Sequence, residues 1–142
     1  MLLALGKSGT AYLLNPAHLG GVGGQVAQAQ VCQAFGAAAV DGSTVYEPCE
    51  GGGMAAISVS GGQIRVLWRG PGSAWGSPVI GGGAVWVADW SAGRLYELNP
   101  ATGAVRYSLS LGTTLPHFAS PSMSGSPAFL GSDAGVTAVA GA

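Results

Sequence analysis

The chain has 142 residues, of which 48% are hydrophobic, only 8% are charged and 26 are glycine, and its net charge is −1. Its five basic residues are scattered singly, whereas a nucleic-acid-binding surface normally clusters Lys and Arg, and no apolar run approaches the roughly 18–20 residues that a membrane-spanning helix needs. This composition argues against a nucleic-acid partner and against a membrane span.

A glycine that leads into an alternating segment recurs at spacings of 40 to 44 residues, at Gly9, Gly53, Gly93 and Gly135. Such a period, filled by short β-segments, is typical of β-propeller blades, which contain four strands and about 40–50 residues each. We therefore expect an all-β partial β-propeller of about three to four four-stranded antiparallel blades. The expected units are residues 1–33, 34–75, 76–118 and 119–142.

The first unit is expected to contain three strands, at residues 1–6, 11–14 and 25–32, because each segment is apolar or alternating and turn residues separate them. These correspond to the second to fourth strands of a blade, so the innermost strand is missing. The apolar start is too short for a signal-peptide core and lacks a basic residue. Any export signal would therefore lie upstream of Met1.

The second unit is predicted to be complete, with strands at residues 37–40, 44–49, 53–59 and 63–68. Its first two strands form a hairpin that turns at Asp41 and Gly42, a favoured two-residue turn. Pairing about that turn places Cys49 opposite Ala34, close to Cys32. We expect a Cys32–Cys49 disulfide, which would indicate an oxidising compartment and stabilise the fold by about 2–3 kcal/mol. The alternative is two buried free thiols.

The third unit is the clearest, with expected strands at residues 77–80, 84–89, 94–98 and 104–111. Short connections rich in Gly, Pro or Asn join them, as in an antiparallel meander. Asp89 and Trp90 follow the second strand, in a loop that could face the mouth of the propeller axis. An exposed Trp beside a carboxylate suits sugar or peptide binding, and the alternative is a packing or turn role.

The fourth unit is expected to have strands at residues 120–123, 128–130 and 135–140, and its outermost strand is absent. A closed ring usually needs about four to eight complete blades. We therefore expect a fragment of a larger ring, with a chain that pairs with copies of itself as an alternative. Unpaired edge strands invite association with another chain, so self-association through blade edges is expected.

The run from Gly93 to Gly103, Gly-x-Leu-Tyr-x-Leu-Asn-Pro-Ala-Thr-Gly, resembles the repeat of pyrroloquinoline-quinone-type (PQQ-like) β-propellers. Ser77-Pro78-Val79 and residues 85–88 precede it as they do in that repeat, and the resemblance covers most of the chain. The family includes quinone-dependent alcohol and glucose dehydrogenases and many secreted or surface-anchored propellers of unassigned role. The resemblance implies the fold rather than the chemistry.

In the dehydrogenases of this family, the resemblance would imply a quinone and a calcium ion held by Glu, Asn and Asp, and often a disulfide between adjacent cysteines. This chain has no adjacent cysteine pair, and its six acidic residues do not group near an Asn as a calcium site requires. We therefore expect no catalytic residue, no cofactor and no metal. Two alternatives stay open: a C-terminal fragment of a PQQ-dependent dehydrogenase that uses PQQ and calcium, and the extracellular sensor domain of a membrane receptor.

His117 lies in the longer connection between the third and fourth units, where ligand-facing loops of a ring can lie. A lone imidazole makes neither a catalytic triad nor a metal site, so Asp89, Trp90 and His117 are candidates for ligand binding only. The function that this sequence favours is a non-enzymatic, extracytoplasmic scaffold that binds a protein or a small ligand.

Overall fold

The computed structural model describes residues 1–72 and 75–141, and within these residues it contains fourteen strands and no helix. No helix long and apolar enough to cross a membrane is therefore found in the described part of the chain. The expected second unit includes residues 73–74 and the fourth ends at residue 142, and these positions lie outside the described residues.

The described strands form four antiparallel sheets, which we number I to IV in chain order. Sheet I contains β1 (Leu2–Leu5), β2 (Thr10–Leu14) and β3 (Ala27–Gln30). Sheet II contains β4 (Ala39–Asp41), β5 (Thr44–Cys49), β6 (Gly53–Ser60) and β7 (Gln63–Arg69). Sheet III contains β8 (Val79–Gly81), β9 (Ala84–Asp89), β10 (Arg94–Leu98) and β11 (Val105–Ser110). Sheet IV contains β12 (Ser122–Met123), β13 (Ala128–Ser132) and β14 (Gly135–Val139).

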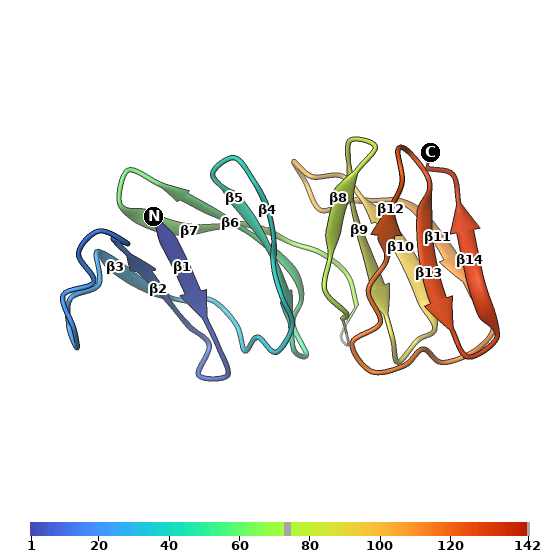
Figure 1. Ribbon diagram of the computed structural model, residues 1–142, viewed down its shortest axis with the longest axis horizontal. Helices are drawn as coiled ribbons and strands as arrows, with labels where there is room; N and C mark the ends of the chain where they lie inside the picture. The colour runs from blue at the N-terminus through green and yellow to red at the C-terminus, as the bar shows by residue number, and fades with distance from the viewer. Residues whose placement is uncertain (73–74, 142) are drawn as a thin grey trace.

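Each sheet is a meander in which every strand pairs with the next one along the chain, and the sheets stand one after another from the N-terminal to the C-terminal end (Figure 1). The sheets do not close into a ring. The predicted all-β fold of three- and four-stranded antiparallel sheets is therefore confirmed. Sheets I and IV have three strands each, as the sequence predicts.

Alternating side chains fill the spaces between neighbouring sheets, so each inner sheet contributes to two cores. Residues from sheets I and II, including Ala11, Val45 and Ile57, form the first core, and residues from sheets II and III, including Tyr46 and Val85, form the second. Residues from sheets III and IV form the third core: Trp86, Leu95, Leu130 and others. Inter-sheet packing therefore accounts for the burial of most apolar side chains.

The recurring glycines have a steric cause. Gly53 and Gly93 have φ values of 72° and 59°, in the left-handed region that favours glycine. A Cβ atom at Gly53 would collide with the backbone carbonyl oxygen of Gly70, and one at Gly93 would collide with that of Thr113. In both sheets the entry to the third strand thus packs directly against the chain that leaves the fourth strand.

A second repeated device joins neighbouring sheets. Ser77 Oγ accepts a hydrogen bond from the backbone N–H of Ala37 at 2.9 Å, and Ser120 Oγ accepts one from the backbone N–H of Ser77 at 3.0 Å. Each serine that begins a unit therefore binds the start of the unit before it. This accounts for the repeated Ser-Pro pairs, because the serine supplies an acceptor between sheets that no ladder hydrogen bond reaches.

The predicted disulfide between Cys32 and Cys49 is confirmed, with Cα atoms 5.5 Å apart. Cys49 pairs with Ala34 in an isolated bridge, as predicted. The expected turn position is wrong by one residue, since Asp41 pairs with Thr44 and the turn falls at Gly42 and Ser43. Gly42, with φ of 56°, takes the first turn position because it adopts the left-handed region without strain.

Candidate functional site

Aromatic side chains surround a pocket of about 170 Å³ on the side of the stack where strands β5 and β9 end. Its walls come from the connections that lead into sheets II, III and IV and from the turns that follow β5 and β9. The lining residues are Phe35, Gly36, Pro48, Cys49, Glu50, Trp75, Trp90, His117 and Phe118. Connections between sheets and turns within them therefore shape this site together.

Trp75 forms the inner wall of the pocket. It is 5% exposed, it pairs with Asp89 in an isolated bridge, and its ring meets Tyr96 edge-on at 5.3 Å between centroids. Its indole Nε1 is buried and has no hydrogen-bond partner among the described residues. A buried donor without a partner costs about 1–3 kcal/mol.

Trp90, His117 and Phe118 form the outer wall as a continuous row of rings. The centroids of Trp90 and His117 are 4.1 Å apart, and those of His117 and Phe118 are 4.4 Å apart. The backbone N–H of Leu115 donates to the carbonyl of Trp90 at 3.0 Å, which fixes the connection that carries His117 against sheet III. Two connections far apart in the sequence thus meet in one surface.

Phe118 adopts an unusual backbone conformation. Its φ is 64°, and it is the one non-glycine residue with a positive φ among the described residues. An aromatic residue in the left-handed region stores strain of about 1–3 kcal/mol, which tends to be retained where a function requires it. The strain turns the exposed Phe118 ring toward the pocket rim, beside His117.

The rim also carries charge of both signs. Glu50 is exposed and lines the pocket. Lys7 comes from the β1–β2 turn of sheet I, and its ammonium lies 5.1 Å from the centroid of the Phe35 ring. A cation over an aromatic face is attracted by the negative face of the ring. The site therefore combines an apolar floor with an anionic and a cationic group at its edge.

The structure brings Trp90 and His117 together at this site, but it places Asp89 differently. Asp89 is only 3% exposed, and its Oδ1 accepts a hydrogen bond from the backbone N–H of Ala92 at 2.9 Å. Its carboxylate closes the β9–β10 turn and is not among the pocket-lining groups. Sequence reasoning did not find Phe35, Trp75 or Phe118 as site residues, and only the position of Phe118 next to His117 could have signalled one of them.

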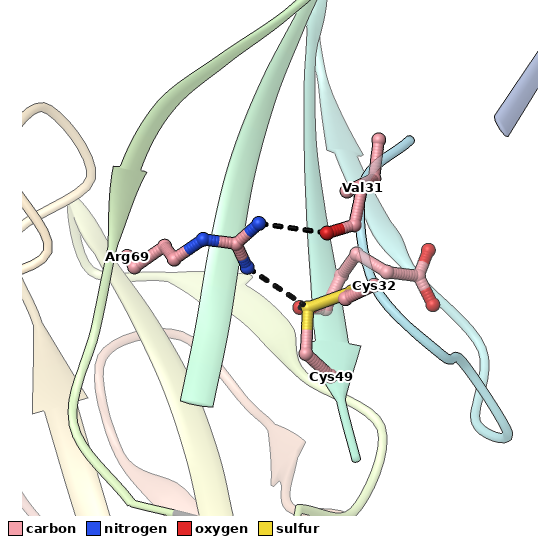
Figure 2. The surroundings of a disulfide bond; sticks show 5 residues. Val31, Cys32, Cys49 and Arg69 are labelled. Carbon is pink, nitrogen blue, oxygen red and sulfur yellow. Dashed lines mark hydrogen bonds between the residues drawn. A yellow bond between two sulfur atoms is a disulfide. The ribbon is translucent and has the colours of Figure 1, made fainter. Parts of the chain in front are cut away.

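The disulfide drawn in Figure 2 joins Cys32 to Cys49, a residue that lines the pocket. Cys49 lines the pocket, and its bond to Cys32 fixes the connection between sheets I and II to the end of β5. Arg69 reaches across from β7, where its Nη2 donates to the carbonyl of Val31 at 2.7 Å and its Nη1 lies 3.7 Å from Cys49 Sγ. A covalent bond and a cation therefore hold this connection in place.

A larger groove of about 520 Å³ runs between sheets I and II. Apolar side chains dominate its lining, including Leu3, Leu5, Val45 and Val59. Glu47 also lines it, and burial raises the pKa of the Glu47 carboxyl to about 7. No other acidic residue lines this groove among the described residues, so the arrangement lacks the partner that acid–base catalysis by a carboxyl pair would use.

The described residues contain no cluster of three or more His, Cys, Asp or Glu side chains that could hold a metal ion. The site offers aromatic faces and two rim charges. Chemically, this set can bind a flat or apolar group.

Comparison with solved structures places this architecture among β-propellers. The chain is similar to BamB from Moraxella catarrhalis, with a TM-score of 0.72 and 19% identity over 98% of this chain and 41% of that chain. It is also similar to the computationally designed protein Ika4, with a TM-score of 0.78 and 13% identity over 99% of this chain and 84% of that one. At these identities the likeness shows the fold alone.

A third similar structure is the glutaminyl cyclase of Myxococcus xanthus, with a TM-score of 0.52 and 15% identity over 85% of this chain and 52% of that one. Of BamB, in contrast, the chain spans less than half of the length. No protein-family model and no curated protein matches the sequence. The resemblance to the PQQ-like family therefore rests on the repeat motif, whereas the propeller fold rests on the structure.

Proposed function

We propose that this chain is a non-enzymatic binding module that holds a segment of another protein in the aromatic pocket, outside the cytoplasm and without a cofactor. The observation that carries the proposal is the row of rings formed by Trp90, His117 and Phe118, which lines the pocket together with Trp75. Stacked sheets supply a rigid frame, and the connections between them supply the binding groups.

The size of the pocket favours a protein segment over a free small molecule. Its volume of about 170 Å³ is below the roughly 300–1,000 Å³ of most small-molecule sites. It accommodates one side chain or one ring, so the rest of the ligand lies on the surrounding surface. A peptide supplies both parts, because one apolar side chain fills the pocket and the peptide backbone lies on the surrounding surface.

The disulfide supports a location in an oxidising compartment, because disulfides are rare in the reducing cytosol. The fold likeness to BamB agrees with a role as a scaffold or binding surface. Neither observation names the partner, so the experiment must search for it.

The test is selection of binders from a phage-displayed random peptide library, followed by measurement of the dissociation constant of the enriched peptide. We expect Trp90→Ala to weaken binding at least tenfold, because it removes a wall of the pocket. Trp75→Phe keeps an aromatic ring at the inner wall but makes it smaller, so we expect a smaller loss of about threefold to tenfold. Leu67→Ala, at an exposed apolar residue outside the pocket, should have no effect.

In an ¹H–¹⁵N spectrum, the indole resonance of Trp75 should shift when the peptide binds. No enriched peptide, or an enriched peptide that binds Trp90→Ala and Trp75→Phe as tightly as the unmodified chain, would refute the proposal. Enrichment only on a parallel oligosaccharide array would refute a protein ligand.

A further inference from the structure

Within the part of the chain that the structure describes, the stack has one sheet face without a partner at each end. On sheet I the free face carries Leu2 and Tyr12, which are 50% and 38% exposed, because Ala11 and Leu13 turn toward sheet II and are fully buried. On sheet IV it carries Val136, which is 76% exposed, and the half-buried Phe129, because Ala128 and Leu130 turn toward sheet III.

Every inner sheet has two chemically different faces, which we call forward, toward the next sheet along the chain, and backward, toward the preceding sheet. Backward faces present aliphatic cross-strand pairs: Val45–Ile57 in sheet II, Val85–Leu98 in sheet III and Ala128–Val139 in sheet IV. Forward faces present an aromatic residue on the second strand: Tyr46 opposite Ala56 in sheet II and Trp86 opposite Glu97 in sheet III. Forward faces always pack on backward faces.

The two free faces belong to these two classes. Sheet I presents its backward face, where Leu2 pairs with Leu14 and Ala4 pairs with Tyr12. The corresponding pairs of sheet III are Val85 with Leu98 and Val87 with Tyr96. In both sheets, one pair consists of two aliphatic residues. In the neighbouring pair, a small or β-branched residue lies opposite a tyrosine.

Sheet IV presents its forward face, where Phe129 lies opposite Ala138. The corresponding pair of sheet II is Tyr46 opposite Ala56, and those two residues pack in one buried cluster with Val85, Val87 and Leu98 of sheet III. The core between sheets II and III is therefore a template for contact between the free face of sheet IV and that of sheet I.

The end sheets also lack the usual protection against association. Their six strands contain no Asp, Glu, Lys or Arg. The outer strands of the inner sheets, in contrast, carry Arg65 and Arg69 on β7 and Arg106 on β11. Burying a charge is costly unless it is paired, so the uncharged faces of the end sheets are suited to being covered.

We propose that the sheet IV free face of one copy of this chain binds the sheet I free face of a second copy, and that two copies close a ring. The contact is head-to-tail, and such contacts form a ring when the rotations close and open chains when they do not. Two copies supply eight sheets, within the usual propeller range of about four to eight blades, whereas three copies exceed it.

The test is sedimentation velocity of the full chain over the micromolar range, with two single variants. The unmodified chain should sediment at twice the chain mass of 13.9 kDa. Tyr12→Asp blocks the sheet I face and Val136→Asp blocks the sheet IV face, and each variant alone should be monomeric because every contact would include one blocked face. Both positions are exposed in the single chain, so circular dichroism should show an unchanged fold.

A mixture of the two variants gives the decisive result. The Tyr12→Asp variant keeps its sheet IV face, and the Val136→Asp variant keeps its sheet I face. These two intact faces can bind each other, so a one-to-one complex should form with a single contact. Leu67→Asp, at a 55% exposed residue of an inner sheet, should remain a dimer and serves as the control. A monomeric unmodified chain, a species larger than a dimer, a dimer that survives either variant, or a mixture that stays monomeric would each overturn the proposal.

Discussion

Single residues with positive φ values mark the places where this chain turns most tightly and the place where it exposes its site. Most are glycines in turns, and at two strand entries, Gly53 and Gly93, a backbone carbonyl also leaves no room for a Cβ atom. Phe118 is the exception, because an aromatic side chain occupies the same backbone region beside His117. The glycines can be predicted from the repeat alone. The conformation of Phe118 depends on a connection that has no equivalent in the other units.

Replacement of Gly93 by Ala should destabilise the chain by about 2–4 kcal/mol. Its φ of 59° disfavours any side chain, and the added Cβ would also collide with the carbonyl oxygen of Thr113. Gly83 is the matched control, since its φ of 73° is equally unfavourable but no atom lies within 4 Å of the added Cβ. Gly83→Ala should therefore cost only about 1 kcal/mol. Urea denaturation measures both, and equal losses would contradict the close approach.

Glu47 should make stability fall as the pH rises. Burial raises the pKa of its carboxyl from 4.5 to about 7 in the folded chain, so between these values the folded state binds a proton that the unfolded state has lost. The free energy of unfolding then decreases with rising pH across that window, by up to about 3 kcal/mol, and is level above it.

Glu47→Gln should remove this dependence, and the difference between the two denaturation curves isolates it from other titrating groups. Glu50→Gln serves as the control because Glu50 is exposed. A difference between unmodified chain and Glu47→Gln that is constant from pH 4.5 to pH 8 would show that the carboxyl is not buried.

At the scale of elements, the disulfide adds a covalent link between two sheets that also meet through side-chain packing, backbone hydrogen bonds and the hydrogen bond from Arg69 to Val31. Cys32 lies just beyond β3 and Cys49 ends β5, so the bond restrains the one connection between sheets I and II. The same connection carries Phe35 into the pocket. Stability of the first interface and the shape of the pocket therefore depend on one covalent bond.

Cys32→Ser combined with Cys49→Ser should lower the free energy of unfolding by about 3 kcal/mol, since the bond closes a loop with a sequence separation of 17. Thermal unfolding followed by circular dichroism gives the measurement. Dithiothreitol should lower the midpoint of the unmodified chain toward that of the double variant and leave the double variant unchanged. A midpoint insensitive to both changes would mean that the bond does not form.

The strands and the disulfide follow from local patterns, which is why the sequence predicts them well. Alternation and glycine-rich turns define each strand, and a two-residue turn sets the approximate pairing that brings Cys49 to Ala34. The pocket does not follow from such patterns. Phe35, Trp75 and His117 lie on three separate connections, and only the packing of whole sheets brings those connections together.

At the scale of the whole molecule, four sheets share three cores that are built in one way. An aromatic or aliphatic forward face meets an aliphatic backward face each time, and serines link neighbouring units at their starts. The repeated backbone therefore does not require a single central core. It requires only that each sheet fit its two neighbours.

Because the same kind of interface joins all neighbouring sheets, duplication or loss of the gene segment that encodes one 42-residue unit would add or remove one sheet without requiring a new kind of interface. The aromatic connections lie outside these interfaces and can diverge freely. Evolution can thus adjust the circumference of such a molecule and the chemistry of its rim as two independent variables.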